Sequence, residues 1–170
     1  MGIYATDLRE LVIRPVLQQL DQWSPTTEDL LLGTAAHESQ LGFRMHSPND
    51  TGLGIYRISP NSHLQLWDTF LVKDPDIASR VRGFASQQQF LRSPDNELVT
   101  NLSYATAIAW MIYKSNLVHI PHNSDPLILA QCWFNSFKPQ HEKANFRDEL
   151  DKFVVNYHKL VLRESKNMAA

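Results

Sequence analysis

Apolar residues recur along most of the chain at intervals of three and four positions, the spacing of one face of an α-helix. Near the end of the chain this repeat runs through Phe146, Leu150, Phe153, Tyr157 and Leu160. No run of strictly alternating apolar and polar residues exceeds about four positions, so extended strands are not expected. The pattern predicts an all-α, or mainly α, fold.

Five prolines mark expected helix starts, because each follows a serine or aspartate whose side chain can accept a hydrogen bond from the first turn. Proline at the first helical position has no amide hydrogen that needs a partner, and its φ is already helical. The pairs are Ser24-Pro25, Ser59-Pro60, Asp74-Pro75, Ser93-Pro94 and Asp125-Pro126. Together with the apolar repeats they predict about seven helices, at 6–21 with a kink at Pro15, 25–41, 60–72, 75–92, 95–116, 126–137 and 142–164.

The segment 95–116 is apolar on nearly every side, and we expect it to be the central buried helix. The one long irregular stretch, 42–58, holds three of the six glycines and is expected to form a loop or a small hairpin. No internal repeat, low-complexity tract or linker divides the chain. We therefore expect a single domain over residues 1–170.

The composition fits such a domain, because 170 residues with 43% apolar side chains can bury a core without disulfides or structural metals. The single cysteine, Cys132, excludes an intramolecular disulfide and a Cys-ligated zinc site. Sixteen basic and eighteen acidic residues give a formal charge of −2. This near balance, with no basic run, argues against nucleic acid as a partner.

The common phosphate, dinucleotide and zinc motifs do not occur in the sequence. Gly52-Leu53-Gly54 lacks the third glycine of a dinucleotide fingerprint. The pairs His37-Glu38 and His141-Glu142 begin like the HExxH zinc motif, but Leu41 and Asn145 stand where the second histidine is required. We expect no bound metal and no cofactor.

Glu38 is the main candidate for acid–base chemistry. On a helix it shares an apolar face with Leu31, Ala35 and Leu41, and it precedes Gly42, a residue typical of helix ends. An apolar surrounding and the negative end of the helix dipole both raise the pKa of a carboxyl group, which then holds a proton near neutral pH. The alternative is that Glu38 points to solvent and only ends the helix.

Two further segments contain residue types suited to binding a glycan. In 54–58 the glycine lets the backbone approach a ligand closely, so Gly54→Val is expected to reduce activity far more than stability. In 129–137 an aromatic ring can stack on a sugar, and the amide of Asn135 can bond a hydroxyl group. Each segment has a structural alternative, the first as an ordinary loop before a helix and the second as part of the core.

In this order the three segments resemble motifs of the lysozyme-like superfamily of lytic transglycosylases and goose-type lysozymes. The closest likeness is to the small transglycosylase-like proteins of tailed bacteriophages. Glu38-Ser39 is similar to the family's Glu-Ser at a helix end. The stretch 54–62 is similar to its Gly-Leu-Met-Gln-Ile-x-Pro-x-Thr motif, and His63 with Trp67-Asp68 looks like the phage variant.

The third and fourth motifs of the family are matched more loosely, by Asn101-Leu102 and Phe134-Asn135. The likeness covers about residues 28–157. One position departs from the pattern, because Arg57 stands where the family has glutamine, and an arginine cannot accept a hydrogen bond as an amide can.

The resemblance implies a peptidoglycan-degrading enzyme that cleaves the β-1,4 bond between N-acetylmuramic acid and N-acetylglucosamine. It implies Glu38 as the catalytic acid and base, and as substrate-binding residues it implies Ser39, Gly54, Ile55, Tyr56, Arg57, Ile58, Phe134 and Asn135. A glycosidase with two carboxylates needs a second acid across the scissile bond, and Asp50 is the candidate by position. The resemblance instead implies one acid/base residue assisted by the substrate's N-acetyl group, as a transglycosylase or a lysozyme.

A non-catalytic virion protein that keeps the fold and binds glycan is the alternative function, and Arg57 favours it. Peptidoglycan glycan strands are the expected partner, with other virion or tail proteins as further candidates. No apolar run is long enough to span a bilayer, and the first ten residues lack the regions of a secretory signal. We therefore expect a soluble protein in a virion or tail-like particle, or in the host cytoplasm before delivery to the cell wall.

Overall fold

The computed structural model of the chain describes residues 2–116, 119–137 and 145–163. Within these ranges the chain forms helices and no β-strand, so the predicted all-α fold is confirmed. In chain order the helices are α1 (Ala5–Leu8), the π-helical η1 (Arg9–Ile13), α2 (Arg14–Gln19), α3 (Pro25–Ser39), α4 (Pro60–Thr69), the 3₁₀ turn η2 (Leu71–Lys73), α5 (Pro75–Gly83), α6 (Gln87–Arg92), α7 (Asn96–Thr100), α8 (Leu102–Ser115), α9 (Pro126–Phe137), α10 (Phe146–Tyr157) and the π-helical η4 (His158–Leu162).

Four of the five proline starts are confirmed. Helices α3, α4, α5 and α9 begin with proline, and the preceding side chain accepts an amide hydrogen bond from the first turn in each. The fifth is wrong, because Ser93-Pro94 precedes a turn and α7 begins at Asn96 after the N-cap Asp95. At the predicted kink at Pro15 the structure has the π-helical segment η1, directly before α2. Proline has no amide hydrogen for the normal α-helical bond, and the preceding turn forms the wider π-helical bonds instead.

Two predicted helices are each divided in the structure. The segment 75–92 is divided because Ser86 caps a new helix, its Oγ accepting from the amide of Gln89 at 3.1 Å. The segment 95–116 is divided at Asn101, whose Oδ1 accepts from the amide of Tyr104 at 3.0 Å. In both segments a polar side chain replaces a helical backbone bond inside an apolar repeat, which the spacing alone does not reveal. The start of the predicted helix 142–164 lies outside the described residues.

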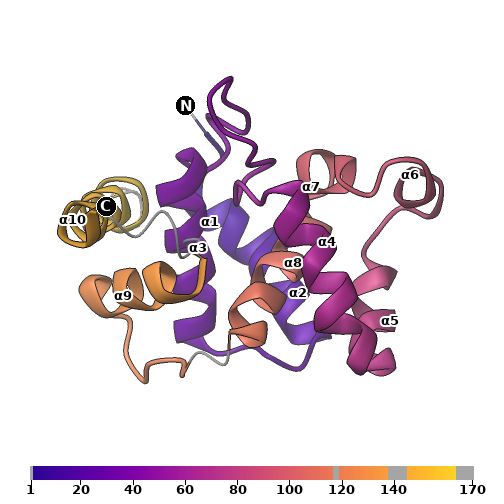
Figure 1. Cartoon of the computed structure of the whole chain (residues 1–170). Coiled ribbons are helices and arrows are strands. Elements are labelled where there is room, and N and C mark those ends of the chain that lie inside the picture. The colour runs from indigo at the N-terminus through magenta and orange to yellow at the C-terminus, as the bar shows by residue number, and fades with distance from the viewer. Residues whose placement is uncertain (1, 117–118, 138–144, 164–170) are drawn as a thin grey trace.

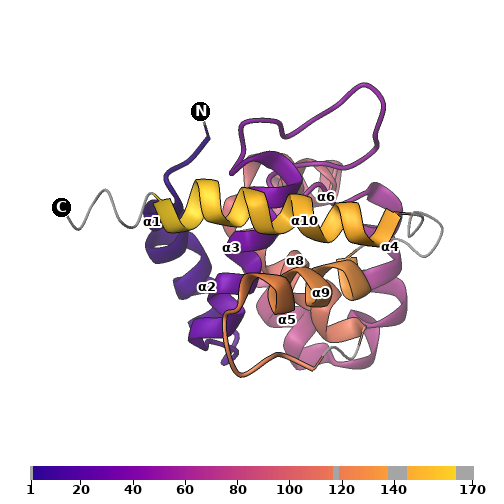
Figure 2. The same cartoon turned by 90° about the vertical axis from the view of Figure 1, so that its left-hand side faces the viewer.

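Helix α3 runs through the middle of the molecule (Figure 1), with α9 and α10 on one side and α4 to α8 on the other. Helix α10 packs on both α3 and α9, as Figure 2 shows from the side. Helix α8 is buried from Tyr104 to Met111, as predicted for a central helix, and α3 is buried to a similar degree. The buried apolar side chains of the described residues form one cluster drawn from both ends of the chain.

The stretch 42–58 forms a loop that stands at the carboxyl end of α3 (Figure 1). It contains two isolated antiparallel bridges, Ser47 with Asp50 and Leu53 with Ile58, and no strand. The predicted loop or small hairpin is therefore a loop with hairpin-like pairing. Its placement brings it next to Glu38, one residue before the end of α3.

A buried carboxylate ties the N-terminal helices to the start of α3. Glu28 is 2% exposed and accepts hydrogen bonds from Arg9, Arg14 and Trp23, each at 2.8 Å. Burial alone would raise the pKa of Glu28, but the hydrogen bonds from Arg14, Trp23 and Arg9 outweigh burial and hold the pKa below its usual value near 4.5. The folded state therefore favours the charged form of Glu28.

Glu28→Gln is expected to lower the free energy of unfolding at pH 7 by about 2 to 3 kcal/mol, because charge-assisted bonds to two partly exposed arginines are lost. The contribution of Glu28 is complete above pH 4.5 and is lost as the pH falls through the lower folded pKa. Urea unfolding at pH 7 and at pH 3 measures both effects. Asp21→Asn, which breaks an exposed pair with Arg80, is the control and should cost much less, because an exposed ion pair contributes little to stability. An equal loss in the two variants would contradict a special role for Glu28.

His63, which the resemblance to phage proteins singles out, lies in a second buried polar network. Its Nδ1 pairs with Oδ1 of Asp95 and its Nε2 with the hydroxyl of Tyr104, both at 2.7 Å. The Tyr104 hydroxyl also accepts from Nε1 of Trp67 at 3.0 Å, so the network joins α4 to α8. Since His63 is 2% exposed, its position in the structure is that of a packing residue in the interior.

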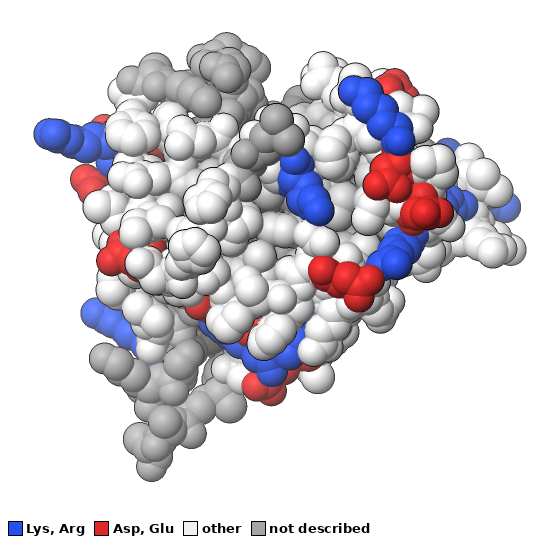
Figure 3. All heavy atoms as spheres, turned by 90° about the horizontal axis from the view of Figure 1, so that it is seen from below, with Lys and Arg blue, Asp and Glu red and all other residues white. Residues whose placement is uncertain are grey.

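Charged side chains are mixed in sign on the face seen in Figure 3. Lys and Arg lie beside Asp and Glu there, around a broad area without charge, and do not gather into a basic patch. No helix within the described ranges is long and apolar enough to cross a membrane.

Candidate active site

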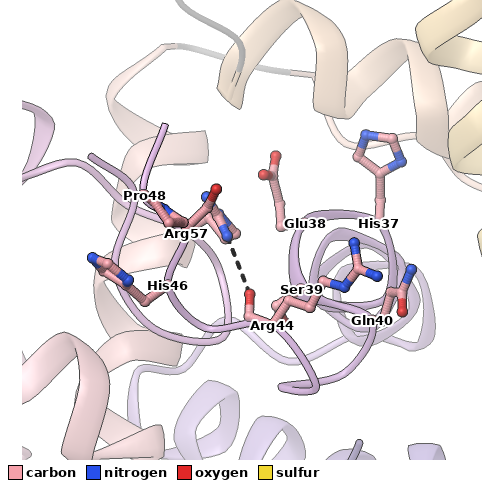
Figure 4. A pocket seen from close by; sticks show the side chains of 9 residues that line it. His37, Glu38, Ser39, Gln40, Arg44, His46, Pro48 and Arg57 are labelled. Carbon is pink, nitrogen blue, oxygen red and sulfur yellow. Dashed lines mark hydrogen bonds between the residues drawn. The ribbon is translucent and has the colours of Figure 1, made fainter. Parts of the chain in front are cut away.

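A polar pocket of about 470 Å³ opens where the end of α3 meets the loop. From α3 and the residue after it come His37, Glu38, Ser39 and Gln40, and from the loop come Arg44, His46, Ser47, Pro48 and Arg57. Figure 4 shows Glu38 pointing into this space from the last turn of α3, with His37 on one side and Arg57 on the other. The sequence-predicted acid therefore lies in the pocket, together with Arg57.

Trp133 of α9 holds the carboxyl group of Glu38. The indole Nε1 donates a hydrogen bond to Oε1 of Glu38 at 2.8 Å, across 95 positions of sequence. Trp133 is fully buried, with the His37 ring centroid at 4.3 Å and the Phe153 ring centroid at 5.6 Å. The alternative that Glu38 only ends the helix in solvent is therefore wrong, because its side chain is partly buried and fixed by a buried donor.

The end of α3 differs from the prediction. The helix stops at Ser39, two residues earlier than expected, and Gln40 rather than Gly42 is the first residue in the left-handed conformation. Gln40 and Leu41 have φ values of 54° and 56°, and Arg57 has a φ of 51°. Such conformations cost non-glycine residues about 1 to 3 kcal/mol each and gather at functional sites. Of the four non-glycine residues with a left-handed φ in the described part of the chain, Gln40 and Arg57 line the pocket, and Leu41 and Asp21 (φ 55°) do not.

Ser39 has a structural role that corrects its expected place among substrate-binding side chains. It is 1% exposed, and its hydroxyl donates to the carbonyl oxygen of Ile55 at 2.6 Å. The same hydroxyl accepts from the amide of Gly42 at 2.8 Å. Ser39 therefore fastens the loop to the helix beside Glu38, and its buried hydroxyl is engaged inside the protein.

The side chains of Ile55, Tyr56 and Ile58 point into the core, which corrects their prediction as glycan contacts. Their exposed fractions are 0%, 0% and 2%, and the Tyr56 hydroxyl pairs with Thr106 at 3.0 Å. Burial raises the pKa of Tyr56 well above its usual value. None of the three lines the pocket.

Three backbone amides of this stretch are also engaged within the protein. The amide of Gly54 donates to Met45 at 3.1 Å, that of Arg57 to Gly54 at 3.1 Å and that of Ile58 to Leu53 at 3.0 Å. Gly54 itself is buried, with a φ of 72°, and a Cβ there would lie 1.8 Å from the carbonyl oxygen of Leu98. The absence of a side chain at Gly54 lets the backbone of α7 pack closely against the loop. This corrects the prediction that the glycine lets a glycan approach the backbone.

Arg57 is the one residue of 54–58 that lines the pocket. Its side chain is 9% exposed, and its Nη2 donates to Oδ2 of Asp50 at 2.6 Å. Asp50 is half-exposed, accepts from the amide of Gly52 at 2.6 Å, and is not among the residues that line the pocket. The candidate second carboxylate thus lies in the loop outside the pocket lining, which disfavours it as a nucleophile opposite Glu38.

The looser motif matches place their residues outside the pocket. Phe134 is buried and packs edge-on against Phe146 at 4.9 Å, and Asn135 of the same helix is exposed. Asn101 caps α8 and donates to Phe84 and Glu97, both at 2.8 Å. The residue of α9 that reaches Glu38 is Trp133, which sequence reasoning did not select. The sequence does contain one indication of this role. A tryptophan in an apolar helix is expected to be buried, and its indole N–H group then needs an acceptor such as a carboxylate.

No group of three or more histidine, cysteine or carboxylate side chains arranged to hold a metal occurs among the described residues. Comparisons of the chain with protein-family models, curated proteins and solved structures gave no match.

Proposed function

We propose that this chain is a peptidoglycan-degrading enzyme of the lysozyme-like class, acting as a lytic transglycosylase or a lysozyme with Glu38 as its acid and base. The observation that carries the proposal is the Glu38 carboxyl group, which a buried indole orients in a polar pocket at a helix end. The left-handed backbone conformation of Gln40 and Arg57 at the same pocket supports the proposal, because such costly conformations cluster at functional sites.

In the proposed reaction Glu38 donates its proton to the glycosidic oxygen as the bond from that oxygen to C1 of N-acetylmuramic acid breaks. The acetamido group of the same sugar stabilises the positive charge that develops at C1. The sugar's 6-hydroxyl oxygen then bonds to C1, and the Glu38 carboxylate takes the hydroxyl proton. The product is a 1,6-anhydro ring, and attack by water in place of the 6-hydroxyl gives hydrolysis. Glu38 is the one carboxyl group among the residues that line the pocket, which favours this single-acid scheme over one with two carboxylates.

Purified protein is expected to cleave glycan strands of isolated peptidoglycan, because one positioned acid and base is sufficient for the scheme. Zymography detects the cleavage, and mass spectrometry of the fragments distinguishes the two products. Anhydro ends, one water lighter than reducing ends, identify a transglycosylase. Binding of glycan strands without cleavage under any condition would overturn the catalytic proposal in favour of a non-catalytic glycan-binding protein.

On the resemblance to phage proteins alone, we also propose that the chain travels in a virion or tail-like particle and that particle proteins are among its partners. Mass spectrometry of purified particles tests this part of the proposal. Consistent absence of the chain from them would contradict it without affecting the proposed chemistry.

A further inference from the structure

The pocket that contains Glu38 carries more positive than negative charge. The lining residues include two guanidinium groups, those of Arg44 and Arg57, and a single carboxyl group, that of Glu38. The imidazoles of His37 and His46 also line the pocket. In Figure 4 Arg57 lies on one side of Glu38, and the Arg44 side chain extends along the end of α3 on the other. A site for a purely neutral sugar polymer has no need of two arginines beside its acid.

Arg57 is held rigidly for a polar contact. Its side chain is 9% exposed, Nη2 donates to Asp50 at 2.6 Å and Nη1 donates to the carbonyl oxygen of Arg44 at 3.2 Å. A guanidinium has five N–H groups in a planar fork, so these two bonds leave others for a ligand in the pocket. Its left-handed backbone is a costly conformation that the bridge between Leu53 and Ile58 maintains.

Arg44 adds a second guanidinium without an internal counterion. It is exposed, and it forms no ion pair with any carboxylate in the part of the chain that the structure describes. The carbonyl oxygen of Arg44 accepts from Arg57, so the backbone of Arg44 lies next to the Arg57 guanidinium, while the Arg44 side chain extends away along the end of α3. A guanidinium suits a carboxylate, whose two oxygens match the spacing of its donors.

We propose that Arg57, assisted by Arg44, binds a carboxylate of the substrate, so that the pocket selects acid-bearing glycan strands over neutral polymers of N-acetylglucosamine. This inference rests on the proposed function and names the chemical group that the same site recognises. In peptidoglycan the carboxylate has two sources. One is the lactyl group of N-acetylmuramic acid that has no stem peptide, and the other is the stem peptide itself.

The test measures binding of three glycans of matched length to the Glu38→Gln protein, which should not consume them. They are a chitooligosaccharide, a glycan strand stripped of peptides and a strand that keeps its peptides. We expect the acid-bearing strands to bind at least tenfold more tightly than the chitooligosaccharide, and added salt to weaken this preference. A preference for the stripped strand identifies the lactyl carboxylate, and a preference for the peptide-bearing strand identifies the stem peptide.

In the same background Arg57→Gln should reduce binding of the preferred strand roughly 10- to 100-fold and leave chitooligosaccharide binding unchanged. Arg80→Gln, which removes an exposed arginine paired with Asp21, is the matched control and should change neither. Thermal unfolding of each variant checks that it is folded.

Equal affinity for all three glycans, with cleavage of peptidoglycan by the wild type intact, would overturn the carboxylate inference and leave the proposed function standing. Unchanged binding of the acid-bearing strands in Arg57→Gln would also overturn the carboxylate inference, and the ion pair of Arg57 with Asp50 would then be purely structural. Neither binding nor cleavage of any strand by the wild type would overturn the proposed function together with the inference.

Discussion

Glu38→Gln is expected to reduce glycan cleavage by at least about 10²- to 10⁴-fold, the range that general acid–base catalysis supplies, while the protein stays folded. Glutamine has the size of glutamate but no proton to transfer at neutral pH. Its amide oxygen can still accept the hydrogen bond from the indole of Trp133, so the packing of α9 against α3 is kept. We therefore expect a melting temperature at pH 7 equal to or slightly above that of the wild type.

Asp50→Asn is the matched control, because it also converts one carboxyl group of this region into an amide. If Glu38 acts alone, Asp50→Asn should leave turnover within about tenfold of the wild type, a smaller loss than removal of an acid–base group causes. A fall as large as that of Glu38→Gln would instead make Asp50 a second catalytic carboxylate. Full cleavage by a folded Glu38→Gln protein would eliminate the proposed mechanism.

The helices could be predicted from sequence because their signals are local. An apolar repeat and a capping residue before proline act within one or two turns, and α9 begins and ends as predicted at Pro126 and Phe137. The failures are also local in cause. Asn101 ends α7 and caps α8, and Ser86 caps α6, each within a continuous apolar repeat. The repeat does not show whether such a side chain faces solvent or bonds the backbone.

The candidate site could be predicted only in part, because its residues meet through long-range packing. Glu38 was found from the helical face that it shares and from a motif that spans a few residues. Its partner Trp133 lies on α9, and only the packing of α9 against α3 brings the indole to the carboxyl group. Within 54–58 the motif does not give the direction of each side chain, so the sequence predicts glycan contacts for residues that fill the core.

Gly54 is a second residue whose role depends on long-range packing. The sequence predicts that a substitution there reduces activity more than stability, whereas the structure predicts a large loss of stability. Gly54→Ala should lower the free energy of unfolding by about 4 kcal/mol, which combines about 1 to 3 kcal/mol of left-handed strain with about 1 to 3 kcal/mol of overpacking. The reasons are the φ of 72° and a Cβ position 1.8 Å from the carbonyl oxygen of Leu98, an atom of the backbone that cannot rotate away. For a chain of this length the melting temperature should fall by roughly 8 to 16 °C.

Gly83→Ala is the control for the glycine substitution itself. An added Cβ at Gly83 would meet no atom within 4 Å, so this variant should be as stable as the wild type or more stable by about 0.4 to 1 kcal/mol. Thermal unfolding of both variants, with activity measured well below the melting temperature of each, separates the two roles of Gly54. A Gly54→Ala protein with wild-type stability and lost activity would return the glycine to the glycan-binding surface. If activity falls only in proportion to the loss of folded protein, Gly54 has a structural role. It then allows the loop beside Glu38 to pack against the backbone of α7.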